Sequence, residues 1–315
     1  RLRRRMASMP VVHAAAKCHR SFMDSLQSPI KAALWMGASI TCFVVMSVAG
    51  RVATAELDVF QVMLIRSVIG FFMLMPLVHL AGGLRAMRTA LPLQHLGRNV
   101  AHFAGQFAWL LALGMIPLAQ LVAIEFTQPF WTALLAMLVL GERMTWRKVA
   151  ALLFGIAGVL VIVRPGSGPI DPGHLVMLAG AVFFGVSVVM VKLLTRSDSV
   201  VKIIFWMLVI QTAIGLVPAL IVWEAVPAEI WPALRVSAFT GTYSHYCMAR
   251  ALVHAEATVI MPMDFVRLPA TALVGWAVYA EHLDVYTAAG ALLILMGNVL
   301  TIRRGKSRPA AVESP

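Results

Sequence analysis

Long runs of apolar residues, each sufficient to cross a bilayer, constrain the fold of this chain more than any other feature. A bilayer core is ~30 Å thick, so a helix needs about 20 apolar residues to cross it. Of the 315 residues, 60% are hydrophobic and 13% are charged, and part of so much apolar surface must face lipid. We therefore predict an all-α polytopic membrane protein with ten transmembrane helices. They are expected at 31–50, 59–80, 97–116, 118–140, 146–164, 173–194, 202–222, 235–254, 257–279 and 285–302.

Basic residues gather on alternate sides of these predicted helices. The net charge of +12 lies mainly between spans and at the chain ends, which favours a topology signal over nucleic-acid binding. Only Arg51, Arg164 and Arg235 fall on the side predicted to be outside. We expect both termini in the cytoplasm and a location in the cell (inner) membrane. The residues assigned to the cytoplasmic side include Arg85, Arg88, Arg98, Arg143, Arg147, Lys148, Lys192, Arg196, Lys202, Arg250, Arg303, Arg304, Lys306 and Arg308.

A pattern of proline, glutamate and glycine occurs twice, with the same spacing from glutamate to glycine. Five helices per copy is an odd number, so the two halves must have opposite orientations, as in many secondary transporters. The copies are Pro129, Glu142, Gly158 and Pro269, Glu281, Gly297. The predicted organisation is an N-terminal cytoplasmic tail at 1–30, with Met23 as an alternative start, a first repeat at 31–164, a second at 173–303 and a tail at 304–315.

This doubled pattern resembles the drug/metabolite transporter superfamily, EamA type, over about residues 31 to 303. Ala280 replaces the glycine that precedes the glutamate in the first copy, and Pro269 stands one residue closer to its glutamate. The resemblance implies two inverted five-helix repeats. It also implies a central cavity lined mainly by the third, fourth, eighth and ninth helices. Members of the superfamily move amino acids, vitamins such as riboflavin, nucleotide-like metabolites or drugs.

Among the ionisable residues inside the predicted spans, four stand out: Arg66, Glu125, Asp264 and Arg267. Such residues are costly in lipid and are functional candidates unless they pair. Glu125 and Asp264 lie at mirrored depths in the two repeats. A carboxylate without a cation is a candidate for proton coupling. One held by Arg66 or Arg267 is instead a fixed counter-ion or a substrate clamp, and the sequence leaves both readings open.

Polar residues at helical spacing suggest faces that line a cavity, although helix–helix hydrogen bonding is the alternative reading. Trp109 and Tyr246 are suited to stacking on a planar solute. These candidates are Asn99, His102, Gln106 and Trp109 on the third helix; Glu125, Gln128 and Thr132 on the fourth; and Tyr243, Tyr246, Arg250 and the neighbouring His245 on the eighth.

The repeated motif residues themselves suggest structural roles. Pro129 and Pro269 lack a backbone N–H, which predicts helix kinks. Glu142 and Glu281 are expected to cap the following helix. Close helix contacts, in a scaffold or a homodimer, are expected at Gly155, Gly158, Gly290 and Gly297.

The sequence contains no nucleotide-binding loop, metal-binding pair or nucleophile motif, and Cys18, Cys42 and Cys247 have no metal or disulfide spacing. We therefore expect no cofactor, no metal and no catalytic residue. The leading prediction is a secondary transporter that moves a small polar or amphiphilic metabolite by alternating access. An uncoupled channel is the alternative, and a membrane-embedded enzyme is less favoured. The expected partners are the lipid bilayer, the solute, a coupling proton and a second copy, without nucleic acid.

Overall fold

The computed structural model describes residues 29–140, 146–165, 170–195, 197–254, 260 and 263–301. Residues 1–28 of the predicted N-terminal tail, the whole predicted C-terminal tail and Glu142 lie outside this part of the chain. Within it, the regular elements are all helices. They are α3 (Pro29–Glu56), α4 (Val59–Leu80), α5 (Pro92–Leu113), α6 (Leu118–Glu125), α7 (Gln128–Leu140), α8 (Trp146–Val163), α9 (Pro172–Leu194), α10 (Val200–Ile221), α11 (Trp231–His254), α13 (Arg267–Tyr279) and α14 (Val285–Thr301), with short 3-10 turns η1 (Leu84–Met87) and η2 (Ala228–Ile230).

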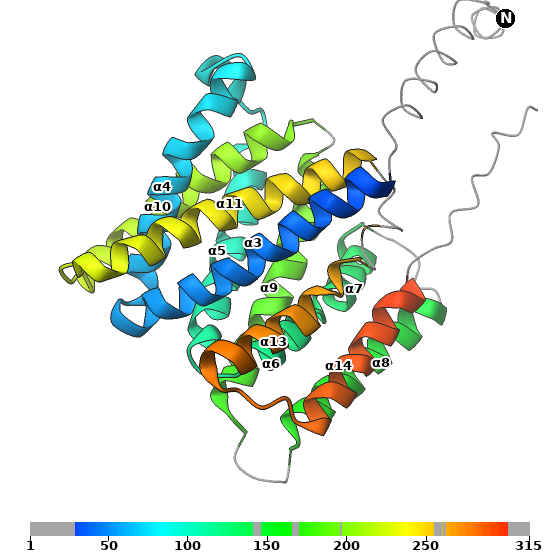
Figure 1. Ribbon diagram of the computed structural model, residues 1–315. Helices are drawn as coiled ribbons and strands as arrows, with labels where there is room; N and C mark the ends of the chain where they lie inside the picture. The colour runs from blue at the N-terminus through cyan, green and yellow to red at the C-terminus, as the bar shows by residue number, and fades with distance from the viewer. Residues whose placement is uncertain are drawn as a thin grey trace, which may run out of the picture.

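The packing of these helices shows the two related halves. α3 packs against α11 and α5 against α9, while α4 packs against α10, α6 against α13 and α8 against α14. Each helix of the first half has a counterpart five spans later, so α3 corresponds to α9 and α5 to α11. The pair α3–α11 therefore corresponds to the pair α9–α5, and each of the other three pairs joins a helix to its own counterpart. Figure 1 shows α3 and α11 side by side, and α14 alongside α8. The fold is therefore a ten-span helical membrane protein built from two inverted five-helix repeats.

Helix length and apolarity vary across the fold. Within the described residues, four helices are long and apolar enough to cross a membrane by composition alone: Ile30–Glu56, Val59–Leu80, Pro172–Val191 and Val200–Ile221. Val149–Val163 and Val285–Leu300 are apolar but shorter. α5 does not qualify by composition because its sequence includes buried Arg98, Asn99 and His95. The least apolar helices are thus the place to look for a polar site.

The fourth span is broken rather than continuous. α6 ends at Glu125 and α7 begins at Gln128, so Pro129 lies in the first turn of α7 and not a turn or more inside a helix. The first turn of a helix tolerates proline because its N–H groups have no intrahelical partner. The carbonyl of Phe126 at the break accepts a hydrogen bond from the Asn298 side chain at 2.9 Å.

The ninth span has the corresponding arrangement. A turn at Phe265 and Val266 precedes α13, and Pro269 lies in the first turn of that helix. The breaks align by sequence as well, because Glu125 and Asp264 each stand immediately before a phenylalanine. Interrupted helices place backbone ends and polar side chains inside a membrane protein, which is where transporters bind solutes.

Gly158 and Gly290 allow the backbones of α8 and α14 to approach closely. A Cβ on Gly158 would lie 2.6 Å from the Gly290 carbonyl oxygen, and one on Gly290 would lie 2.5 Å from that of Gly158. Both distances are far below van der Waals contact, so the prediction of close helix contacts here is confirmed. This contact is part of the scaffold within one chain.

Candidate solute site

α5 connects the polar features of the protein from one end to the other. His95 lies near its start, Arg98 and His102 follow on successive turns, and Trp109 lies closer to its end. At 1.5 Å per residue, the helix is ~33 Å long, about the thickness of a bilayer core. The named residues, from His95 to Trp109, therefore cover ~21 Å, or about two thirds, of that depth.

A buried charge network lies where the two broken helices meet. The guanidinium of Arg267 lies 3.0 Å from Oε1 of Glu125 and 3.8 Å from Oδ2 of Asp264. The indole N–H of Trp109 donates to Oε2 of Glu125 at 2.9 Å. The same guanidinium stacks over the rings of Phe43 and Phe126, at 4.1 and 4.7 Å from their centroids.

The helix ends make this pair unusual. Glu125 is the last residue of α6 and Arg267 is the first residue of α13. A carboxylate at a helix C-terminus and a cation at an N-terminus are each unfavourable with respect to the helix dipole. Their mutual attraction offsets both penalties, and it joins the two repeats at their breaks. A purely structural tie would not need the unfavourable helix ends, so we treat this pair as part of the candidate site.

Two further guanidinium groups lie buried near this network. The charges of both Arg66 on α4 and Arg98 on α5 act on the ring of His102. They also act on His245 of α11, together with that of Arg267. His245 is exposed although guanidinium groups on three helices act on it, so side chains do not fill the space beside it. We call Arg66, Arg98, Arg267, His102 and His245 the arginine cluster.

The remaining predicted residues of the third and fourth helices have mixed surroundings. Asn99 is buried: its Oδ1 accepts from Arg98 at 2.7 Å and its Nδ2 donates to the Trp206 carbonyl at 3.3 Å. The ring of His102 lies 5.5 Å from that of Phe184, while Oε1 of Gln106 is buried without a hydrogen-bond partner. Gln128 is half-buried at the start of α7. Asn99 thus serves packing between helices, and Gln106 remains available to a ligand.

The aromatic stripe of the eighth helix does not join the arginine cluster. Tyr243 stacks on Phe239 and on Tyr246, with centroids 5.4 and 5.8 Å apart. At ~100° per residue, Tyr243 lies on the face of α11 nearly opposite to that of Gly241 and His245. The exposed Phe239 and Tyr246 share this outward face. The structure therefore brings His245, not the tyrosines, next to the arginines.

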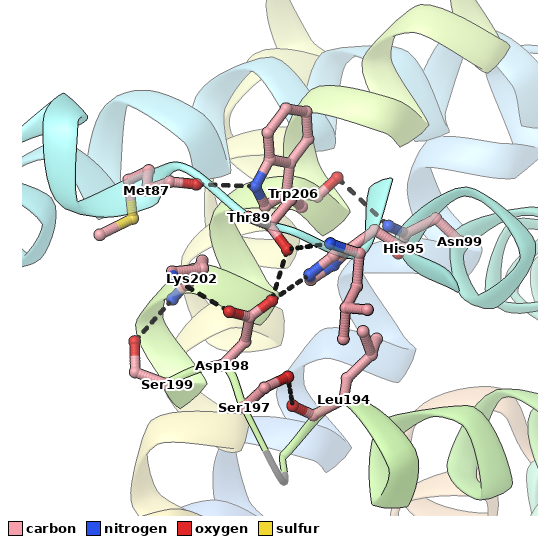
Figure 2. Close-up of polar contacts among 11 residues, drawn as sticks. Met87, Thr89, His95, Asn99, Leu194, Ser197, Asp198, Ser199, Lys202 and Trp206 are labelled. Carbon is pink, nitrogen blue, oxygen red and sulfur yellow. Dashed lines mark hydrogen bonds and ion pairs between the residues drawn. The ribbon is translucent and has the colours of Figure 1, made fainter. Parts of the chain in front are cut away.

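At one end of the bundle, Asp198 lies in the turn between α9 and α10 and joins the two repeats (Figure 2). Its carboxylate accepts hydrogen bonds from Thr89 at 2.7 Å and Lys202 at 2.9 Å, and it lies 2.8 Å from Nε2 of His95. Burial alone would raise the pKa of Asp198. The hydrogen bonds from His95, Lys202 and Thr89, with the charge of Lys202, outweigh burial and lower that pKa to about 2.

At the opposite end of the bundle, Glu281 joins the two repeats. Its Oε1 pairs with Arg51, and its Oε2 accepts a hydrogen bond from the backbone N–H of Leu118 at 2.9 Å. Arg51 also donates to the carbonyls of Leu113 and Ile116, each at 2.6 Å. Glu281 therefore caps α6 of the other repeat, whereas the sequence suggested that it would cap the following helix, α14. That helix is capped by Asp284, which accepts from the N–H of Thr287 at 2.7 Å.

Sequence reasoning missed several residues of these clusters. Arg51 and Arg98 are basic residues near predicted helix ends, and they were counted only as topology signals. Asp198 and His95 lie outside the predicted spans and carry no motif. One signal was available for Arg98, because it stands one turn before His102 on the same face of the third helix.

A surface pocket of about 590 Å³ lies apart from all of these residues. It is lined by residues 54–58, between α3 and α4, and by residues 221–224 at the end of α10. It is formed by helix ends and contains none of the arginine cluster.

The model of the EamA-like transporter family matches residues 30–164 and again residues 171–303. The chain belongs to this family. It is 34% identical to a riboflavin transporter from Rhizobium johnstonii over 232 residues, 72% of this chain and 77% of that relative. It is 22% identical to an S-adenosylmethionine uptake transporter from Rickettsia prowazekii over 279 residues, 89% of this chain and 95% of that relative.

A solved crystal structure has the same fold. It matches 87% of this chain and 96% of its own, with a TM-score of 0.60 and 18% sequence identity. As an EamA-like transporter, the chain is a multi-pass membrane protein that moves a small metabolite across the membrane. The arginine cluster and the Glu125–Arg267 pair, between the contacts of Asp198 and those of Glu281, are its candidate solute site.

Proposed function

We propose that this EamA-like protein carries riboflavin, or a metabolite of similar size with a planar ring, by alternating access between its two repeats, residues 31–164 and 173–303. The similarity to a riboflavin transporter over most of both chains carries this proposal. The arrangement of the site supports it. Polar groups inside the bundle suit a solute with many hydrogen-bonding atoms, and aromatic Trp109 and Phe43 beside Arg267 suit a ring.

The contacts that join the two repeats at each end favour a carrier over an uncoupled channel. The Asp198 cluster and the Glu281 cluster lie near opposite ends of α5, with the candidate site between them. A carrier alternates by opening one such end at a time, whereas a channel conducts when both are open. Each cluster is made of a few side-chain contacts and is therefore able to separate without unfolding a helix.

Transport of radiolabelled riboflavin into proteoliposomes tests the proposal. A carrier shows saturable uptake and counterflow, in which internal unlabelled riboflavin accelerates entry of the label. A linear, non-saturating flux would identify a channel. Chromatography of the recovered label tests the expectation that the protein is not an enzyme, because the solute must emerge unchanged. Absence of uptake for riboflavin and for similar planar metabolites would refute the substrate assignment.

The proposal places the protein in the cell inner membrane with both termini in the cytoplasm, as the distribution of Lys and Arg favours. Reporter fusions after Arg88, Arg147 and Arg308 should report the cytoplasm, and fusions near Gly168 and Glu229 the outside. A cytoplasmic signal near Gly168 would contradict this topology. We expect no bound nucleic acid, and we expect a second copy to associate without supplying a residue to the site, since the candidate residues all lie within one chain. Light scattering of the purified protein measures its oligomeric state.

Coupling to protons is the remaining part of the proposal. Arg267 lies closer to Glu125 than to Asp264, which favours a fixed ionised role for Glu125 and leaves Asp264 as the better coupling candidate. Transport by Glu125→Gln and Asp264→Asn is measured as external pH is varied. Asp264→Asn should lose accumulation but keep exchange, and Glu125→Gln should lose both. If both variants accumulate solute normally, neither carboxylate takes part in coupling.

A further inference from the structure

Arg66 and Arg98 are buried cations for which the described part of the chain provides no acidic partner. Their relative exposures are 9% and 8%. Nε and Nη1 of Arg66, and Nε of Arg98, are buried without a hydrogen-bond partner. Buried guanidinium groups are expensive to desolvate and are normally paired. Two of them on facing helices call for an explanation.

The acidic side chains at the two helix breaks are already engaged. Glu125 and Asp264 both lie against Arg267, so two carboxylates stand beside three guanidinium groups. With the histidines neutral, the described charges of this region sum to +1, from three positive and two negative side chains. The excess positive charge is located at Arg66 and Arg98.

The packing keeps the Arg66 guanidinium in place without satisfying it. Its Nη2 lies 3.3 Å from the sulfur of Met46, a weak acceptor. A Cβ on Gly241 would lie 3.0 Å from the same nitrogen, so the absence of a side chain at this position of α11 makes room for the guanidinium. His245, one turn further along α11, is exposed. Unsatisfied donors of Arg66 therefore lie one helical turn from a part of α11 that side chains do not cover.

We propose that Arg66 and Arg98 bind an anionic oxygen group, a carboxylate or a phosphate, of the transported solute. This inference rests on the proposed function for the location of the solute. Riboflavin itself is neutral, so the inference favours, among ring metabolites of similar size, those that also carry an anionic group. Guanidinium groups favour such oxygens because their N–H donors match the geometry of carboxylate and phosphate. Binding of the anion supplies the charge and the acceptors that the protein lacks.

Two matched pairs of probes test the inference with the intact protein. Riboflavin and riboflavin 5′-phosphate share a ring and differ by a phosphate, while nicotinamide and nicotinate differ by a carboxylate. Titration calorimetry in detergent should show that the anionic member of at least one pair binds about tenfold or more tightly than the neutral member. The pair that shows the preference identifies the group as phosphate or carboxylate. The preference should weaken as salt is added.

Arg66→Gln and Arg98→Gln should each remove about tenfold of the preference for the anion, with less effect on the neutral probe. The control is Arg235→Gln, the same change at an exposed arginine over Trp231, which should leave the preference intact. Arg66→Lys keeps the charge and should retain part of it. If a glutamine variant does not fold, the salt dependence of the unmodified protein still tests the inference.

Equal binding of both members of both pairs, or a preference unchanged in Arg66→Gln and Arg98→Gln, would overturn the inference. The proposed function fails differently, through absence of riboflavin transport. Transport of riboflavin without any preference for anions would leave the function standing and remove the inference. A preference for anions that depends on Arg66 and Arg98, without riboflavin transport, would support the inference and refute riboflavin as the substrate.

Discussion

Replacement of Asp198 by asparagine tests whether its cluster holds one end of the transporter closed. The carboxylate makes three polar contacts, with Thr89, His95 and Lys202. Lys202 is on the helix that Asp198 precedes, so that contact persists when the end opens. The contacts with Thr89 and His95 cross to the segment before α5 and to α5 itself, in the other repeat, and these must break.

The size of the effect follows from these contacts. The pKa of Asp198 is about 2, compared with an ordinary value of 3.8, and at 1.36 kcal/mol per pKa unit the carboxylate contributes about 2 to 3 kcal/mol as an upper limit. Asparagine keeps neutral hydrogen bonds and loses their charge-assisted part, about 1 to 2 kcal/mol over the two crossing contacts. The equilibrium should shift towards opening by roughly 5- to 30-fold.

Thiol accessibility measures this shift. A single cysteine introduced by His245→Cys, with the native cysteines replaced, is modified by an impermeant reagent added to inside-out vesicles. Asp198→Asn should raise the modification rate by roughly 5- to 30-fold. Asp58→Asn is the control, because Asp58 caps α4 at the opposite end by accepting from Phe60 N–H, and asparagine caps as well as aspartate.

The effect should also be constant over about pH 5 to 8. The pKa of Asp198 is depressed in the folded protein, so its contribution is complete above the unfolded value of about 4 and is lost only as pH falls towards 2. A rate that changes less than twofold in Asp198→Asn would refute the closing role. A difference between variant and parent that disappears between pH 7 and pH 5 would refute the assignment of the effect to this carboxylate.

Two further changes test the opposite end and the scaffold. Glu281→Ala removes the partner of Arg51 and the cap of α6, and it should lower the free energy of unfolding by about 1 to 3 kcal/mol. The control is Asp284→Ala, which should cost less because the ion pair of Asp284 with Arg164 is more exposed. Equal losses in the two variants would contradict the reasoning. Gly158→Ala places a methyl group against the Gly290 carbonyl and should destabilise the folded protein by about 1 to 3 kcal/mol. In the control, Gly37→Ala, the added Cβ has nothing within 4 Å, so the change should be neutral or slightly stabilising. Similar melting temperatures for the two variants would show that α8 and α14 can move apart freely.

The number of spans and their pairing into repeats were predictable because a bilayer imposes helix length directly on the sequence. The breaks in the fourth and ninth spans were only partly predictable. Pro129 and Pro269 mark them, but proline is compatible both with a kink inside a helix and with the first turn of a new one. The choice depends on tertiary partners such as Asn298, which binds the carbonyl that the first break leaves free.

The residues of the site were predictable where a charge lies deep in a span, as for Arg66, Glu125 and Arg267. They were not predictable near the ends of α5, because a basic residue there has the same sequence signature whether it faces the cytoplasm or the interior. Arg98 is of this kind: its burial depends on its neighbours in space. Hydropathy and charge counts register depth along one helix, and they carry no information on what the adjacent helices supply.

The two repeats differ in charge at the corresponding breaks, and this difference has a direct physical consequence. Glu125 aligns with Asp264, and three residues later Gln128 aligns with Arg267. One guanidinium therefore serves two equivalent carboxylates, and it lies nearer to Glu125 than to Asp264. In a carrier built from inverted repeats, the two access states exchange the conformations of the halves. In the state that opens to the opposite side of the membrane, Arg267 should then lie nearer to Asp264 than to Glu125. The same guanidinium would therefore change its carboxylate partner each time the direction of access changes.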